Sequence, residues 1–395
     1  MGIHQENAPM KFYSILLFFL LYSNCLAAAT DCEQGYDPQR DYFPDKTNLR
    51  YATGFTVEYF KHYKVVTVLT PWPGAKETFR YVLVQCGAPA PDGYANAQRI
   101  EIPVRRVAAM STTQLPHLEL LGEVGRLVAV SDIKPVNSTA VNQRFQAGQL
   151  SEIGHGTSVE LESVVELETD LVMAVATAQS QYNAHPVLLQ AGIAVALNAE
   201  YTEATLLGRT EWLKYTALFF NKEHKAQQHV DAIAAQYETY AAKTRQLSPA
   251  QRPTVFGGAL WRGTWYISGG KSYPAQLLHD AGGRYVWGDD TSRSSLPLDF
   301  EAVYEKAHTA DIWLPQRNEW HNLEDAARAD ERYADLAAYK NGRVFNANAR
   351  LNEHGGNDYW ENGIAEPHIL LADLIKIIHP QLLPEHQLKF YKALD

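Results

Sequence analysis

The chain has 395 residues, of which 46% are hydrophobic, enough for two domains at about 100–200 residues each. This composition can fill two cores and argues against disorder over most of the length. The formal net charge is −10 and Lys and Arg are scattered, which excludes a nucleic-acid-binding surface from the main hypotheses.

The N-terminus predicts a secretory signal peptide over residues 1–29. An apolar run covers residues 12–22, Lys11 precedes it, and the alanines at 27–29 favour cleavage after position 29. The run is too short for a transmembrane helix, which needs about 20 residues. Met10 suits this pattern better as a start than Met1 does.

Cleavage removes Cys25 and leaves Cys32 and Cys86. In an oxidising compartment these two can form one disulfide that ties the mature N-terminus to the first β segment. Two unpaired buried thiols are the alternative. A lipid anchor on Cys25 is a second route of export, although residues 22–24 (YSN) match poorly the small and aliphatic residues usual at such a site.

Residues 30–98 predict an N-terminal extension that contains a β-hairpin. Residues 56–60 alternate, residues 64–69 are β-branched and apolar, and residues 81–84 follow a turn at 73–74. This extension can cap a cleft, contact a partner or pack beneath the lobe that follows it, and of these we expect packing.

Residues 99–209 alternate short apolar strands with helices, which predicts a doubly wound α/β lobe. The expected strands are 104–110, 127–130, 171–175 and 193–197, and the expected helices include 115–121 and 159–167. Residues 253–395 repeat this alternation and predict a second lobe. Its expected strands are 254–260, 311–314 and 343–346, and its expected helices are 273–281, 300–307 and 367–378.

Residues 210–247 predict one long helix between the two lobes. The segment has neither Gly nor Pro, and apolar residues such as Trp212, Phe220 and Tyr237 recur at helical spacing. A helix of this length would run about 55 Å at about 1.5 Å per residue. The predicted fold class is therefore α/β, with two Rossmann-like lobes joined by one long helix and a small N-terminal β appendage. We expect Trp212 and Trp313 to lie in the core.

Two segments carry a resemblance to a known family. Residues 159–172 (VELESVVELETDLV) form a helix-then-strand unit, and residues 298–313 contain a second unit, LDFEAVY, that ends at ADIW. These units resemble those of the helix-linked (class III) periplasmic substrate-binding proteins of ABC importers for iron-siderophores, haem and vitamin B12. The resemblance extends from about residue 100 to the C-terminus. Thr169 stands where the family usually has proline.

The resemblance implies an exported, monomeric protein of the periplasm that passes its ligand to a permease in the inner membrane. It places the permease-docking carboxylates at Glu162 and Glu301. Exposed carboxylates at helix N-termini are favoured by the helix dipole, and such charges set docking orientation more than affinity. The alternative is that each is an ordinary glutamate of a first helical turn.

Ligands of open α/β sheets bind beyond the carboxyl ends of the strands. Large aromatic rings there suit a macrocycle or chelate, arginines suit acidic ligand groups, and a histidine can bind a metal or a polar group. The candidates are Trp261, Arg262, Trp265, Tyr266, Trp287, His155 and Arg350, with Tyr201 and Trp360 as further possibilities. Each tryptophan can instead belong to the core.

The sequence thus predicts a binding protein for an iron chelate or a corrinoid (cobalamin), with no catalytic residues, no protein metal site and no cofactor. The tryptophans slightly favour a corrinoid. A binding protein for bare Zn²⁺ or Mn²⁺ shares the plan but needs three or four converging His, Asp or Glu side chains, and the 14 histidines are dispersed. A secreted α/β hydrolase is the enzyme alternative, although the chain has no Gly-x-Ser-x-Gly motif.

Overall fold

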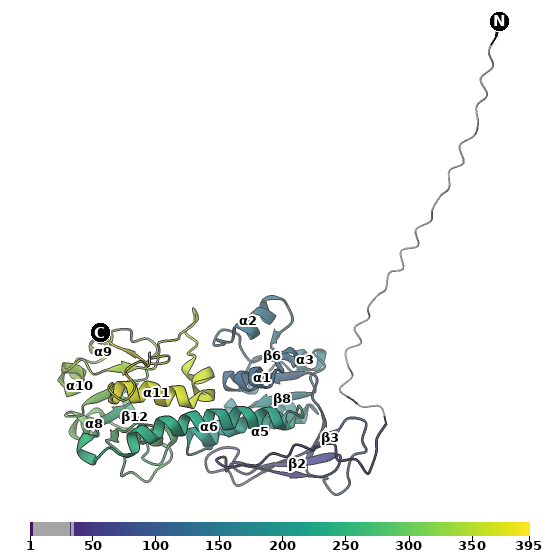
Figure 1. Cartoon of the computed structure of the whole chain (residues 1–395), viewed down its shortest axis with the longest axis horizontal. Coiled ribbons are helices and arrows are strands. Elements are labelled where there is room, and N and C mark those ends of the chain that lie inside the picture. The colour runs from purple at the N-terminus through teal and green to yellow at the C-terminus, as the bar shows by residue number, and fades with distance from the viewer. Residues whose placement is uncertain (3–31, 33–34) are drawn as a thin grey trace.

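The computed structural model describes residues 1, 2, 32 and 35–395. Residues 3–29 of the predicted signal peptide, Cys25 among them, lie outside the described residues. Residues 35–395 form two α/β lobes that lie side by side and are joined along one side by helix α6 (Glu223–Arg245), with a separate sheet below the first lobe (Figure 1).

The separate sheet has four strands in the order β1-β2-β3-β4: β1 (Phe55–Tyr59), β2 (Tyr63–Val68), β3 (Phe79–Gln85) and β4 (Gln98–Ile102). The first three are antiparallel, and β4 runs parallel to β3. The predicted boundary at residue 99 is therefore wrong. In β4 the buried Ile100 and Ile102 alternate with exposed Arg99 and Glu101, so the strand adds to this half-buried sheet.

A disulfide joins Cys32 to Cys86, the residue after β3. It ties Cys32, just after the predicted signal peptide, to the end of an inner strand of the N-terminal sheet. No metal ion or thiol chemistry is needed to explain these two cysteines.

The N-terminal sheet packs against helix α5 (Leu206–Leu218), which follows the last strand of the first lobe. The aromatic rings of Phe55, Trp212 and Tyr215 pack against one another, with ring centroids 4.9–5.4 Å apart. Lys64 of β2 is fully buried and forms an ion pair of 2.5 Å with Glu223. Burial lowers the pKa of Lys64 to about 8 despite this partner.

Two carboxylates of the first lobe anchor the chain that leads into β1. Glu211 accepts hydrogen bonds from the backbone N–H groups of residues 50–52, and Glu203 accepts them from Thr53 and Gly54. Glu203 also accepts from the Trp212 indole N–H at 2.9 Å. Because buried carboxylates need such donors, the extension is an integral part of the first lobe.

The first lobe is built on a parallel sheet in the order β7-β6-β5-β8-β9. The strands are β5 (Val107–Ala109), β6 (Leu127–Val130), β7 (Ser151–Glu152), β8 (Leu171–Ala174) and β9 (Val195–Leu197). The helices are α1 (Leu115–Leu121), α2 (Thr139–Gln146), α3 (Leu161–Glu166) and α4 (His185–Gln190), with short 3-10 turns η1 (Thr112–Gln114), η2 (Val124–Arg126), η3 (Gly156–Ser158), η4 (Ser180–Tyr182) and η5 (Glu200–Thr202). The central strands are buried on both faces, as parallel sheets covered by helices are.

The linking segment consists of two helices, so the prediction of one helix over residues 210–247 is wrong in detail. Helix α5 ends at Leu218 and α6 begins at Glu223. Between them Asn221 has a φ of 54°, a left-handed conformation that asparagine tolerates better than most residues. Lys64 donates to the Leu218 carbonyl at 2.9 Å and to the Asn221 side chain at 2.8 Å. A lysine from a strand distant in the sequence thus supplies a hydrogen bond to a carbonyl group at the end of α5.

The second lobe combines three small sheets. Its parallel sheet has the order β13-β10-β15, formed by β10 (Thr254–Gly257), β13 (Arg284–Tyr285) and β15 (Ile312–Leu314). An antiparallel sheet contains β11 (Leu260–Trp261), β12 (Thr264–Ser268) and β14 (Ser295–Leu298), and a third pairs β16 (Phe345–Asn346) with β17 (Lys392–Ala393). The helices are α7 (Tyr273–Asp280), α8 (Phe300–Ala307), α9 (Leu323–Ala329), α10 (Ala337–Lys340) and α11 (Pro367–Ile378), with the 3-10 turns η6 (Pro249–Gln251) and η7 (Glu331–Asp335) and the π-helix η8 (Tyr359–Gly363). Trp313 lies at its centre and Trp212 in the first core, both fully buried as predicted.

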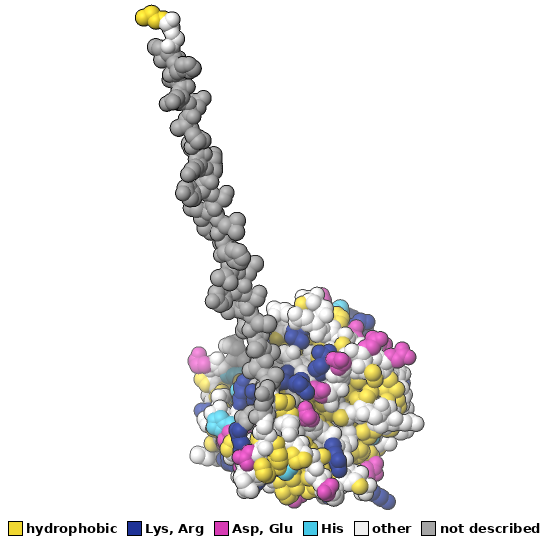
Figure 2. All heavy atoms as spheres, turned by 90° about the vertical axis from the view of Figure 1, so that its right-hand side faces the viewer, with side chains coloured by type: hydrophobic (Ala, Val, Ile, Leu, Met, Phe, Trp, Pro, Cys, Tyr) yellow, Lys and Arg dark blue, Asp and Glu magenta, His cyan; other side chains and the backbone are white. Residues whose placement is uncertain are grey.

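The end of the molecule formed by the first lobe and the N-terminal sheet carries both signs of charge over the same area, interspersed with hydrophobic side chains (Figure 2). Within the described part of the chain, no helix is both long and apolar enough to cross a membrane.

Candidate ligand-binding site

A cavity of about 540 Å³ lies between the two lobes. The first lobe contributes Tyr201 to its wall, and the second contributes Tyr266, Tyr273 and Trp360. The turn between β2 and β3 of the N-terminal sheet also reaches the cavity, through Thr70, Pro73 and Gly74. A concave site walled by aromatic rings from both lobes can enclose a flat or bulky organic ligand.

Tyr201 follows β9, at the carboxyl edge of the first sheet. Its hydroxyl donates to the Ala176 carbonyl at 2.7 Å, which fixes the ring. Burial, with the nearby Glu200 adding to it, raises the pKa of Tyr201 to about 12. The hydroxyl therefore stays neutral at physiological pH and remains a hydrogen-bond donor.

Below Tyr273 lies a buried ion pair of the first lobe, and its arginine reaches the second lobe. Arg209 of α5 pairs with Glu200 of η5 at 2.5 Å, and its guanidinium lies over the Tyr273 ring at 4.5 Å. Both charged side chains are 5% exposed. This cation–π contact fixes the position of the Tyr273 ring, which lines the cavity, relative to helix α5.

Glu203 and Arg293 are the charged residues among the described residues that line the cavity. The Glu203 carboxylate is already occupied by backbone N–H groups of the N-terminal extension. Arg293 lies in the exposed segment before β14. The cavity therefore presents a guanidinium without an equally available carboxylate, which suits an acidic ligand group.

Of the residues proposed as ligand contacts from the sequence, Tyr266 lines this cavity, and so do the two further candidates Tyr201 and Trp360. It is 51% exposed, whereas its neighbour Trp265 is fully buried. The predicted loop is in fact a hairpin of β11 and β12, turned at Arg262 and Gly263, which both have positive φ. Alternation along β12 then places Trp265 in the core and Tyr266 outside.

Trp265 and Trp287 are corrections to the predicted ligand set. The Trp265 indole N–H donates to the Gly257 carbonyl at 3.0 Å inside the core of the second lobe. Trp287 is 5% exposed and packs beside Tyr285, with Lys306 over its ring at 5.3 Å. Both rings fill the lobe and leave no face for a ligand.

Trp261, Arg262 and His155 are exposed but lie outside the cavity lining. The Arg262 guanidinium lies 5.1 Å from the Trp261 ring centre, and that of Arg317 lies 5.4 Å from it. His155 stands between β7 and η3.

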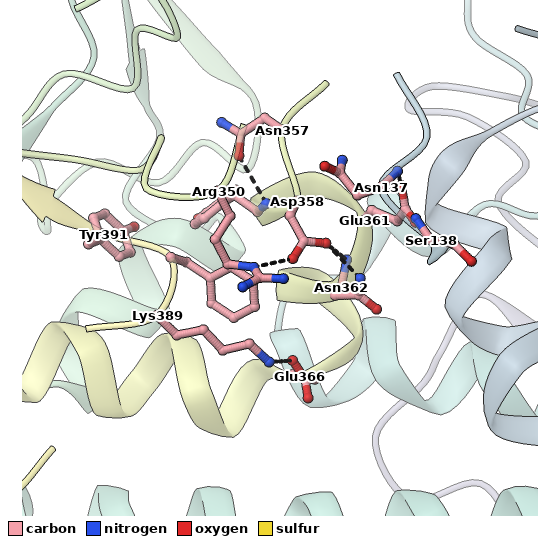
Figure 3. Close-up of polar contacts among 12 residues, drawn as sticks. Asn137, Ser138, Arg350, Asn357, Asp358, Glu361, Asn362, Glu366, Lys389 and Tyr391 are labelled. Carbon is pink, nitrogen blue, oxygen red and sulfur yellow. Dashed lines mark hydrogen bonds and ion pairs between the residues drawn. The ribbon is translucent and has the colours of Figure 1, made fainter. Parts of the chain in front are cut away.

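Arg350 forms an ion pair with a neighbouring side chain. Its guanidinium forms an ion pair of 2.5 Å with the buried Asp358, as Figure 3 shows. It borders a second hollow of about 510 Å³ together with Glu119 and Ser138 of the first lobe. Arg350 thus lies between the lobes, but away from the aromatic cavity.

Glu162 and Glu301 both lie in the first turn of an exposed helix end, α3 and α8 respectively. These helices belong to different lobes and lie toward opposite ends of the molecule (Figure 1). Glu301 pairs with Arg332 at 3.1 Å, and its side chain remains 74% exposed.

Sequence reasoning missed Tyr273, Arg293 and Gln316, which also line the cavity. Gln316 follows β15, so its place at a carboxyl strand end was an available signal. Tyr273 begins helix α7 and Arg293 lies between β13 and β14, positions that only the packing of the lobes brings to the cleft.

Across residues 35–395, no three His, Cys, Asp or Glu side chains lie close enough to hold a metal ion.

The model of the family described as "Periplasmic binding protein" matches residues 107–351, which span both lobes and the linking helices. The chain belongs to the periplasmic binding protein family. Like other members, it is a periplasmic binding protein of an ABC transporter. The N-terminal sheet lies outside the matched residues.

Several proteins are similar to this chain. An uncharacterized lipoprotein of Methanocaldococcus jannaschii is 25% identical over 307 residues, 75% of this chain and 70% of the relative. A possible iron-binding periplasmic solute-binding protein of Staphylococcus epidermidis has a TM-score of 0.54 at 15% identity, covering 70% of this chain and 99% of its own. The molybdate-bound periplasmic binding protein MolA of Haemophilus influenzae has a TM-score of 0.54 at 18% identity, and the match covers 72% of this chain and 89% of MolA. At these identities the two structures show a shared fold.

Proposed function

We propose that this periplasmic binding protein captures a metal chelate, either an iron complex or a corrinoid, in the cavity between its lobes. The observation that carries the proposal is the aromatic lining of the cavity. Four aromatic side chains surround its volume of about 540 Å³: Tyr201, Tyr266, Tyr273 and Trp360. Sites for small organic ligands usually measure about 300–1,000 Å³ and are lined mainly by apolar and aromatic groups. Arg293 supplies a charge for acidic groups of the chelate.

Binding needs no chemistry from the protein. The lobes are joined by α5 and α6 and by the contact of the buried Arg209 guanidinium with the Tyr273 ring of the second lobe, so we expect closure on the ligand to be a small tilt. The loaded protein then docks on an importer permease through Glu162 and Glu301, one on each lobe. A bare divalent cation and a hydrolysable substrate are the alternatives that the binding experiment has to separate.

We also propose that the protein is exported by its N-terminal signal and cleaved after Ala29. The apolar run at residues 12–22 and the disulfide of Cys32 and Cys86 support export. The relative from Methanocaldococcus is a lipoprotein, so a lipidated Cys25 is the competing product. The intact mass of the exported protein separates them, because only cleavage after Ala29 yields an unmodified chain that begins at Thr30.

The ligand is identified by titrating the purified mature protein while following tryptophan fluorescence, with calorimetry on every hit. The panel contains cyanocobalamin, haemin, ferric siderophores, and zinc and manganese salts. We expect saturable one-to-one binding of a single chelate and no response to bare ions. Binding of a bare ion alone would overturn the chelate proposal, and turnover of an ester or phosphate substrate would overturn the transport role.

A further inference from the structure

A segment of the second lobe crosses to the first lobe and bonds to its backbone. The Asn352 side-chain amide donates to the carbonyls of Lys134 and Val136 at 2.8 and 3.1 Å. Gly356 approaches the same loop so closely that a Cβ would lie 2.4 Å from the Pro135 carbonyl oxygen. Only glycine therefore fits this crossing. The two lobes meet here through specific contacts, in addition to the linking helices.

Glu361 makes the central contact of this crossing. Its carboxylate accepts the backbone N–H groups of Asn137 and Ser138, each at 2.7 Å. Figure 3 shows Glu361 on η8 reaching toward these two residues of the first lobe. Ser138 caps helix α2, so the carboxylate lies at the N-terminal end of that helix, where a negative charge is favoured.

The residue before Glu361 is Trp360, which lines the ligand cavity and is 41% exposed. Both belong to η8, a single turn of π-helix, and they contact different surroundings. Glu361 is 1% exposed and bonds to the first lobe, while Trp360 faces the cavity. The orientation of this short turn therefore determines where the Trp360 ring lies.

Resting on the proposed ligand site, we propose that Glu361 is a positioning residue: it bonds η8 to Asn137 and Ser138 across the cleft and so fixes Trp360 in the cavity wall. Ligand capture then depends on a hydrogen-bonded bridge that no ligand atom touches. Loss of the bridge frees both the ring and the tilt of the two lobes.

The surroundings of Glu361 make this bridge sensitive to pH. Facing it are Glu119 of α1 and Asp358, and Asp358 is itself paired with Arg350. Burial raises the pKa of Glu361 to about 7. The two backbone N–H groups lower this pKa, and the negative charges of Asp358 and Glu119 raise it further. When the lobes part, the carboxyl meets water and its pKa returns toward the usual value of about 4.3. The bridged state thus binds the proton more tightly, so lower pH favours the bridge and rising pH through 7 weakens it.

The first test measures the distance between the lobes without any ligand. Spin labels are placed at Gln143→Cys on α2 and Lys340→Cys on α10, both exposed. Between pH 6 and 8 the ratio of bridged to open molecules should fall by up to about tenfold in the wild-type protein. The Glu361→Gln variant cannot ionise and should show no pH dependence, and Glu361→Ala should be open at both values.

The matched control is Glu366→Gln, which removes a carboxylate paired with Lys389 of the same lobe and should keep the wild-type profile. A distance that does not change in Glu361→Ala, or a pH response that persists in Glu361→Gln, overturns the inference. With the chelate found by the panel, Glu361→Ala should weaken binding at least about tenfold. If no chelate binds but the distances behave as stated, the proposed ligand fails and the bridge stands.

Discussion

Tyr266 and Trp265 are neighbours in β12 whose side chains lie on opposite sides of the strand. The chemistry of both residues suits a chelate site, and strand alternation alone assigns one to the cavity and the other to the core. The same holds on η8, where Trp360 faces the cavity and Glu361 the other lobe. At the scale of single residues, function here depends on which side of the backbone a side chain occupies.

Replacing Tyr266 by alanine should therefore weaken chelate binding by about tenfold, or ~1.4 kcal/mol, because one aromatic wall of the cavity is lost. The fold should be kept, since the side chain is half exposed. Calorimetry at one pH measures the change. Phe60→Ala is the control, because this exposed ring stacks on Tyr63 at the end of β2 remote from the cavity. Equal losses in both variants would count against the site.

The turn between β2 and β3 is the element that distinguishes this cavity from one built by two lobes alone. Trp72 anchors it by packing with Phe79 and with His185 of α4, at 6.2 and 6.0 Å between ring centres. Thr70 and Gly74 then reach the cavity wall. The N-terminal sheet lies outside the residues that match the family, yet its turn forms part of the cavity wall.

Filling the cavity from this turn tests its role. Thr70→Trp should weaken chelate binding by about tenfold or more, because the new ring would occupy space that the ligand needs and overpacked sites relax poorly. Thr56→Trp places the same ring on an exposed position of β1 in the same sheet and should leave affinity unchanged. Affinity is measured by fluorescence titration. A Thr70→Trp protein that binds normally would show that the turn does not border the bound ligand.

At the scale of the whole molecule, Glu162 and Glu301 place one exposed carboxylate on each lobe. Their helices, α3 and α8, lie toward opposite ends of the protein (Figure 1). A partner that binds both carboxylates must contact both lobes, so its binding depends on the orientation of one lobe relative to the other. The bridge at Glu361 acts on that same tilt from within the cleft.

The double variant Glu162→Ala and Glu301→Ala should abolish uptake of the chelate by cells while leaving its affinity for the purified protein unchanged, because both side chains lie outside the cavity. The pair Glu166→Ala and Glu305→Ala removes two exposed glutamates from the same helices and serves as the control. Uptake of radiolabelled chelate is the measurement. Normal uptake by the first double variant would place the docking surface elsewhere.

The sequence by itself determined the class of fold and the order of its parts. Hydrophobic alternation and helical spacing depend on local geometry, so the parallel strands, the second lobe and the buried Trp212 and Trp313 could be predicted. The family units at residues 159–172 and 298–313 carried the assignment to periplasmic binding proteins.

Tertiary structure decided the site. The break at Asn221 depends on a lysine from a distant strand, and the burial of Trp265 depends on a hairpin register that no local pattern distinguishes from a loop. The contact of Glu361 with Asn137 joins residues 224 positions apart. Such contacts arise from packing between segments remote in the sequence, so their chemistry becomes visible only when the lobes are assembled.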